Sequence, residues 1–211
     1  MNWFPMLLGP LQTNCYILSN SDGRCLIVDP GEEPNKVIHY INQKKLQPKA
    51  ILLTHAHFDH IGAVDAIRDQ YSIPVYIHNK EKEWLSDPER NGSQFFLPGQ
   101  GITAREADHI IMNEMEMNIE GFTFKVFETP GHSPGSISFY FKDVALVVSG
   151  DALFQASIGR TDLPGGNHDE LLRSIHNKLL VLPEETVVLP GHGPATTIGH
   201  EMDSNPFLNG F

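Results

Sequence analysis

Apolar and polar residues alternate in distinct blocks along the first 80 residues. Short apolar runs bounded by turn-forming residues are typical of strands, and they cover residues 14–18, 24–29, 50–53 and 73–77. Val37, Ile38 and Ile41 recur at helical spacing, so a helix is expected between the second and third runs. A second helix is expected to begin near His60. The pattern therefore predicts a β-hairpin followed by a β-α-β passage.

The second half of the chain returns to strand patterns after a polar middle. Residues 79–107 contain a polar helix candidate at 81–85 and a loop with glycine and proline at 97–101. Strands are then expected at 122–128, 136–141, 144–149 and 186–189. A helix is expected from about 169 to 180, with an apolar stripe made of Leu171, Leu172, Ile175 and Leu179. Asn167, three residues before Glu170, resembles a helix N-terminal cap.

Two groups of strands, each followed by helices, predict two sheets packed together with helices outside.

Ligand-type side chains follow the expected strands. The sharpest motif is HAHFDH, which places His55, His57, Asp59 and His60 directly after a short strand. In an extended segment, alternate side chains share a face, so the first three would point the same way. His60 then requires a break in the alternation, which a helix start would supply.

Three later turns each carry one ligand-type residue after an apolar strand. They read TPGHSPG with His132, SGD with Asp151 and PGHG with His192. Glycine allows such turns to adopt positive φ or to approach other backbone closely. A single histidine or aspartate in a glycine-rich turn is more often a turn-forming residue. Together with the first motif, however, the three predict a metal site of imidazoles and carboxylates, a donor set that suits zinc, iron or manganese.

The order of these four motifs resembles the metallo-β-lactamase superfamily and, within it, the glyoxalase II (hydroxyacylglutathione hydrolase) group of thioester hydrolases. The resemblance runs from the Asp29-Pro30-Gly31 turn to His192. It implies an α/β (α+β) fold, a four-layer αββα sandwich with a two-metal site at the sheet edge.

The resemblance also implies a role for each ligand-type residue. His55, His57 and His132 would hold one divalent ion, and Asp59, His60 and His192 a second, with Asp151 bridging the two. Asp59 and Asp151 are the expected catalytic carboxylates. Asp29 is expected to orient a ligand histidine, or else to be a plain turn residue before proline and glycine.

The implied reaction is hydrolysis of a small-molecule thioester, such as an S-lactoylglutathione-type substrate, by a metal-bridging hydroxide. Metal binding lowers the pKa of water to about 7, so no serine or cysteine nucleophile is needed. The GRTD segment places Arg160 on a loop after Asp151. Its guanidinium would clamp a substrate carboxylate, or pair with Asp162 and brace the loop.

Several other functions remain as alternatives. A persulfide dioxygenase of the same superfamily would use one iron, two histidines and a carboxylate. A non-catalytic metal-binding protein is disfavoured by the full set of ligand types. A secreted β-lactamase is disfavoured because the start of the chain lacks the features of a secretory signal.

Composition narrows the partners. The formal net charge of −11 argues against nucleic acid or an anionic membrane as partner, and against an RNA-processing nuclease. No apolar run is long enough for a spanning helix. The only cysteines, Cys15 and Cys25, are expected to be buried thiols, although a single disulfide stays open. A cytoplasmic protein is expected, and the oligomeric state is left open.

The 211 residues are expected to form a single metallo-β-lactamase-like domain. Full-length glyoxalase II enzymes carry an added helical C-terminal domain that helps bind glutathione, and no such domain is expected here. Residues 200–211 would supply a short helix and tail, with Phe207 and Phe211 as anchors to the core.

Overall fold

The computed structural model describes residues 1–97 and 99–208. The chain divides into an N-terminal unit, Met1–Met112, and a C-terminal unit, Asn113–Phe211. Within the described residues the strands form two six-stranded sheets, one in each unit, and one two-stranded hairpin. The organisation as a single domain stays a prediction.

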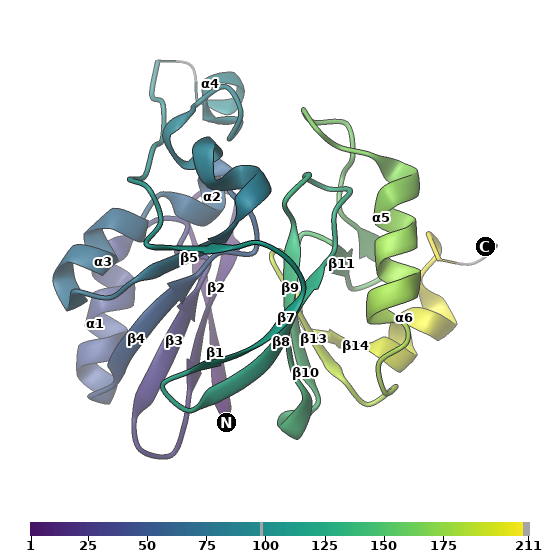
Figure 1. The fold of residues 1–211 in the computed structure, drawn as a ribbon, viewed down its shortest axis with the longest axis horizontal. Coiled ribbons are helices and arrows are strands. Elements are labelled where there is room, and N and C mark those ends of the chain that lie inside the picture. The colour runs from purple at the N-terminus through teal and green to yellow at the C-terminus, as the bar shows by residue number, and fades with distance from the viewer. Residues whose placement is uncertain (98, 209–211) are drawn as a thin grey trace. The chain divides into compact units, whose positions relative to one another are not determined.

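The N-terminal unit begins with an antiparallel meander and continues with parallel strands (Figure 1). Its strands, in sheet order, are β1 (Asn2–Leu8), β2 (Thr13–Ser19), β3 (Arg24–Val28), β4 (Gln47–Leu52), β5 (Val75–His78) and β6 (His109–Ile111). Pairing is antiparallel from β1 to β3 and parallel from β3 to β6. Parallel neighbours need a crossover connection, which is usually a helix.

Two crossovers of this unit carry the helices α1 (Pro34–Lys44), α2 (Phe58–Ile61) and α3 (Val64–Tyr71). Val37 and Ile41 of α1 and Ile67 of α3 pack in one core with Ile27 and Ile51 of the sheet. After β5 the chain forms the 3₁₀-helix η1 (Asn79–Ser86) and the short helix α4 (Ser93–Phe96). The predicted helix at 81–85 is therefore confirmed as a 3₁₀-helix, whereas β1, β6 and α4 were not expected.

The C-terminal unit is mostly antiparallel. Its sheet contains β14 (Thr196–Thr197), β13 (Val187–Pro190), β10 (Leu146–Gly150), β9 (Ile137–Phe141), β8 (Phe122–Glu128) and β7 (Met115–Ile119), in that order. Among the described strands of this sheet, only β10 and β13 pair in parallel. In β8, buried Phe122, Phe124 and Val126 alternate with exposed Thr123 and Lys125, as expected of a strand with one face in the core.

The smaller elements of this unit are the 3₁₀ turn η2 (Lys142–Val144), the hairpin of β11 (Leu153–Phe154) and β12 (Ser157–Ile158), and the helix α6 (Ile198–Ser204).

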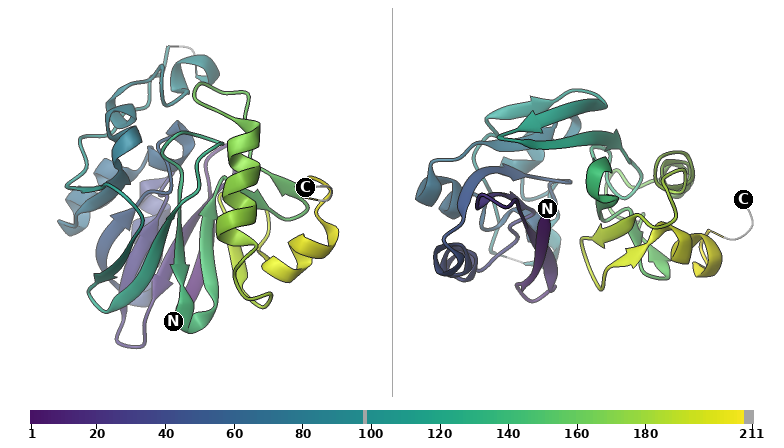
Figure 2. Two further views of the ribbon diagram at one scale, coloured as in Figure 1. Left: turned by 45° about the vertical axis from the view of Figure 1, so that its right-hand side comes forward. Right: turned by 90° about the horizontal axis from the view of Figure 1, so that it is seen from below.

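A long helix packs on this second sheet (Figure 2). It starts as α5 (His168–Ser174) and continues as a π-helical segment, η3 (Ile175–Leu179). The side chain of Asn167 accepts a hydrogen bond of 3.0 Å from the Glu170 N–H, which confirms the predicted cap. The predicted stripe, Leu171, Leu172, Ile175 and Leu179, lies in the core with Val147 and Val188.

The end of the described chain differs from the expectation. Phe207 is 47% exposed, so its predicted role as an anchor is wrong, and Leu208 is the residue that packs into the core. Phe211 lies outside the described residues. Among residues 1–97 and 99–208, the helices lack the length and apolar character that crossing a bilayer requires.

We predict that the two cysteines of the native protein do not react with a thiol reagent at pH 8. Both are free thiols buried in β2 and β3, and burial raises the pKa of Cys25 to about 12 and that of Cys15 well above its ordinary value. The thiolate is the reactive form, so it is scarce at this pH. Labelling should reach two thiols per chain only after unfolding in urea. Rapid labelling of the native protein, or a missing thiol after unfolding, would contradict the structure.

Candidate functional site

Strand direction brings the ligand-type residues of the N-terminal unit to one edge. Strands β3 and β4 run parallel, so the residues that follow them, Asp29 and the segment 54–60, leave the sheet on the same side. Asp29 has a positive φ of 49°, which ends β3 and turns the chain. A Cβ at Gly31 would overlap the carbonyl oxygen of Asp59, so only glycine fits where this turn meets α2.

The carboxylate of Asp29 is buried and tied to the next strand. It accepts hydrogen bonds from the N–H of Thr54, at 2.8 Å, and from its hydroxyl, at 2.6 Å. It also lies 3.1 Å from Nδ1 of His60. A carboxylate only accepts hydrogen bonds, so in the neutral ring Nδ1 carries the proton and Nε2 keeps its lone pair. Asp29 thus makes the contact expected of a residue that orients a ligand histidine.

Three histidine rings meet beside this carboxylate. The ring centroids of His55 and His57 are 4.8 Å apart, and those of His55 and His60 are 4.1 Å apart. All three side chains are buried. Ligand atoms of Asp29, His55 and His60 lie within 4.8 Å of one another, close enough to hold a metal ion.

Asp59 is positioned in a way that strand alternation did not anticipate. Helix α2 begins at Phe58, so the extended segment ends at His57 and Asp59 belongs to the first helical turn. Its Oδ2 accepts a hydrogen bond of 2.7 Å from the Thr13 hydroxyl and lies 3.5 Å from Nε2 of His60. The expectation that one extended face aligns His55, His57 and Asp59 is therefore wrong. The predicted break before His60 is confirmed, and it falls two residues earlier.

Three supporting residues were not anticipated from the sequence. Glu81 of η1 is fully buried and accepts a hydrogen bond of 2.6 Å from the N–H of Ala56, between the first two histidines. The ring of Trp84, on the same helix, lies 5.9 Å from that of His57. A glutamate in a polar segment gives no signal of burial. Thr13 was missed as well, because 46 residues separate it from Asp59.

In the C-terminal unit, the pairing of strands gathers three ligand-type residues. Strands β10 and β13 are parallel and pair Gly150 with Pro190, so Asp151 and His192 follow neighbouring strand ends. The turn that carries His132 precedes β9, which runs antiparallel to β10 and so starts beside its end. As a result, Oδ2 of Asp151 lies 3.6 Å from Nε2 of His132 and 3.5 Å from Nε2 of His192.

The His132 ring is oriented by a backbone group. Its Nδ1 lies 2.8 Å from the carbonyl oxygen of Arg160. A carbonyl only accepts, so Nδ1 donates and Nε2, which faces Asp151, keeps its lone pair in the neutral ring. Glycine is required next to each of these two residues, His132 and Arg160. A Cβ at Gly131 would overlap the backbone of Leu171, and one at Gly159 would overlap the carbonyl oxygen of Asp151.

Each unit thus offers imidazole Nε2 lone pairs beside a carboxylate in a mostly buried setting. Side-chain exposure is 3% for His132, 10% for Asp151 and 30% for His192, so one group in this unit remains accessible from solvent. Imidazole nitrogen and carboxylate oxygen are ligands of zinc, iron and manganese. The donor chemistry of both units therefore fits divalent metal ions.

Comparison with known proteins identifies the family. The sequence model of the metallo-β-lactamase superfamily matches residues 8–192, most of the chain. The chain belongs to the metallo-β-lactamase superfamily. The predicted membership and the α/β fold class of this family are confirmed.

Two curated relatives cover almost the whole chain. A probable metallo-hydrolase, YqgX of Bacillus subtilis, is 58% identical over 100% of this chain and 99% of its own length. The hydroxyacylglutathione hydrolase GloC of Haemophilus influenzae is 38% identical over 94% and 93%, respectively. The chain is therefore classed as a metal-binding hydrolase of this superfamily.

Solved structures agree with this assignment. The crystal structure of BLEG-1, a B3 metallo-beta-lactamase, has a TM-score of 0.97 and 58% identity over 99% of this chain and 100% of that one. The structure of TTHA1623 in a di-iron-bound form has a TM-score of 0.84 and 42% identity over 97% and 100%.

Arg160, the expected substrate contact, is engaged within its own loop. Its guanidinium donates to both carboxylate oxygens of Asp162, at 2.7 and 2.8 Å, which is the bracing role given as the alternative. This pairing holds the pKa of Asp162 at about 2. A substrate contact of Arg160 stays a prediction for this superfamily member.

We predict that Asp29→Ala lowers the free energy of unfolding by about 2–4 kcal/mol. The change leaves the buried N–H and hydroxyl of Thr54 and Nδ1 of His60 without their common acceptor. Urea denaturation measures the loss. The control is Asp143→Ala at an exposed carboxylate, which should change the same quantity by less than about 0.5 kcal/mol. Equal values for the two variants would remove the anchoring role of Asp29.

Proposed function

We propose that the chain hydrolyses small-molecule thioesters with two divalent metal ions. His55, His57 and His132 would hold one ion, Asp59, His60 and His192 the other, and Asp151 would bridge them. The observation that carries the proposal is the pair of Nε2 atoms, of His132 and His192, within 3.6 Å of the Asp151 carboxylate. A shared carboxylate between two imidazoles suits a bridging ligand.

The residues of the chain prepare this centre in three ways. Asp29 and the Arg160 carbonyl each hold one imidazole with its Nε2 lone pair available. Thr13 donates to one oxygen of Asp59 and so limits the rotation of that carboxylate. Glu81 fixes the backbone between His55 and His57. When bound, divalent ions would supply a nucleophile at neutral pH and polarise the acyl carbonyl.

The thioester assignment is supported by the similarity to hydroxyacylglutathione hydrolase GloC over most of both chains. The acidic balance of the chain favours a small-molecule substrate over nucleic acid. Zinc is the metal we propose, with iron the first alternative because of the similarity to a protein solved in a di-iron-bound form. The cytoplasm is the proposed location, because reduced, buried cysteines suit a reducing compartment.

Hydrolysis of β-lactams is a second candidate. It is favoured by 58% identity to BLEG-1, whose crystal structure is that of a B3 metallo-beta-lactamase. This reaction, too, requires nucleophilic attack on an acyl carbon, so the same metal ligands would support it. Steady-state kinetics with S-lactoylglutathione, acyl thioesters and a chromogenic cephalosporin ranks the two by kcat/KM.

We predict that Asp59→Ala lowers kcat/KM for thioesters by more than about a hundredfold, beyond the loss typical of residues that only support a ligand. The same change should reduce bound metal from about two ions per chain to about one, because one site loses its carboxylate. Metal analysis of the purified protein, run beside the kinetics, measures both.

The matched control is Asp203→Ala, at an exposed aspartate of α6, which should keep both values. Unchanged turnover in Asp59→Ala would remove its assigned role. One iron per chain, with oxygen uptake on glutathione persulfide, would overturn the hydrolase in favour of the dioxygenase.

A further inference from the structure

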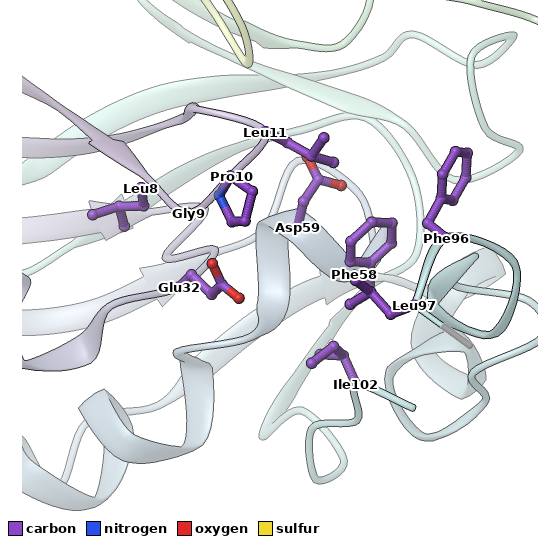
Figure 3. Close-up of a pocket in the computed structure, with 10 residues that line it drawn as sticks. All are labelled: Leu8, Gly9, Pro10, Leu11, Glu32, Phe58, Asp59, Phe96, Leu97 and Ile102. Carbon is purple, nitrogen blue, oxygen red and sulfur yellow. The ribbon is translucent and has the colours of Figure 1, made fainter. Parts of the chain in front are cut away.

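A cavity of about 250 Å³ lies in the N-terminal unit beside Asp59 (Figure 3). Four segments line it: the tip of the β1–β2 hairpin at residues 8–11, Glu32 in the turn after β3, the first turn of α2 with Phe58 and Asp59, and the segment around α4 with Phe96 and Ile102. The proposed chemistry of Asp59 does not account for the apolar remainder of this cavity.

The rim exposes large apolar side chains. Leu11 is 49% exposed and Phe96 is 45% exposed, and the ring of Phe96 stacks on that of Phe58 with 5.7 Å between centroids. Single exposed apolar residues are common, but a group of them around a concave surface marks a binding site. Figure 3 shows Leu11, Phe58, Asp59 and Phe96 among the side chains that line the cavity.

The hairpin tip that forms one wall is held in place. The N–H of Gly9 donates to the Glu33 carboxylate at 3.0 Å, and the Gln12 N–H donates to the Gly9 carbonyl at 3.1 Å. Lys36 donates to the Leu7 carbonyl at 2.7 Å. Gly9 has a φ of 67°, and a Cβ there would overlap the Glu32 carboxylate. The wall is therefore formed before any ligand arrives, which reduces the entropic cost of binding.

The charges of the lining select the kind of ligand. Among the described residues that line the cavity, the only ionisable groups are the carboxylates of Glu32 and Asp59. The ion proposed at Asp59 would offset the charge of that carboxylate, but at Glu32 a substrate carboxylate, such as those of glutathione, would meet like charge. A neutral apolar group would instead bury its surface against Leu11, Phe58 and Ile102.

The volume limits the size of this group. A cavity of about 150 Å³ holds benzene, so about 250 Å³ accepts a phenyl ring or an alkyl chain of moderate length. Because Asp59 forms part of the wall, a chain seated here ends next to a proposed metal ligand.

We infer that this cavity binds the acyl chain of the substrate and that the preferred acyl group is apolar, in the range from butanoyl to octanoyl or a phenyl-bearing equivalent. The inference rests on the proposed thioester hydrolysis and adds the substrate class. It assigns Leu11, Phe96 and Ile102 as specificity-determining residues and leaves the thiol carrier outside the cavity.

The first experiment measures kcat/KM for N-acetylcysteamine thioesters from acetyl to decanoyl. We expect a rise of about fourfold for each added methylene, the value for transfer of one methylene from water, until the cavity is filled. The octanoyl-to-acetyl ratio should fall about tenfold in Phe96→Ala and in Leu11→Ser. The control is Phe207→Ala, just after α6, which removes a phenylalanine with an exposure of 47%, close to that of Phe96. This variant should keep the octanoyl-to-acetyl ratio.

The second experiment measures binding without turnover. Methyl-labelled isoleucine and leucine are followed by NMR while 1-hexanol is added, with ethanol as the short-chain control. We expect saturable shifts at Leu8, Leu11 and Ile102 with hexanol, while Ile119 in the C-terminal unit stays unshifted. Loss of these shifts in Phe96→Ala would support the assignment.

The outcomes separate the two hypotheses. Thioester hydrolysis with no dependence on chain length, or absent shifts at the cavity methyls, overturns the acyl-chain site. Hexanol shifts at those methyls without any thioester turnover keep the cavity as an apolar site and overturn the proposed function instead.

Discussion

The buried carboxylate of Asp29 is the contact on which the N-terminal ligand group depends. One side chain accepts from the backbone and hydroxyl of Thr54 and lies in hydrogen-bonding distance of His60. It therefore joins the end of β3, the end of β4 and the first turn of α2. A buried acceptor with several donors strongly favours one arrangement, because each donor would lose a hydrogen bond if the loops separated.

In the C-terminal unit, strand pairing and backbone groups position the ligand-type side chains. Parallel pairing of β10 and β13 places Asp151 and His192 at adjacent strand ends, and the Arg160 carbonyl orients His132. Gly131 and Gly159 allow the supporting backbone to approach where a side chain would collide. The glycine-rich turns therefore do more than form loops, because they allow the backbone to pack closely around the ligand-type side chains. The Arg160–Asp162 pair braces the loop that supplies the orienting carbonyl.

Local sequence was sufficient for much of the fold and for the identity of the ligand-type residues. The strand at 122–128, the Asn167 cap and the stripe on α5 follow from side-chain period and capping chemistry, which act over a few residues. The end of the strand alternation before His60, at the start of a helix, was also expected. Short elements such as β1 and β6 were missed, because β1 contains a proline and does not alternate apolar with polar residues, and β6 has only three residues.

By itself, the sequence determined which side chains are candidate metal ligands, because imidazoles and carboxylates suit zinc, iron or manganese and here stand in recognisable turns. Only the tertiary structure decided how they are held: Thr13 reaches Asp59 across 46 residues, and Glu81 lies buried under the histidine segment. The apolar cavity beside Asp59 was likewise decided by the tertiary structure, since Leu11, Phe58 and Ile102 come from segments far apart in the sequence. Contacts between such segments depend on how strands and loops pack, and this packing is not encoded in any short stretch of residues.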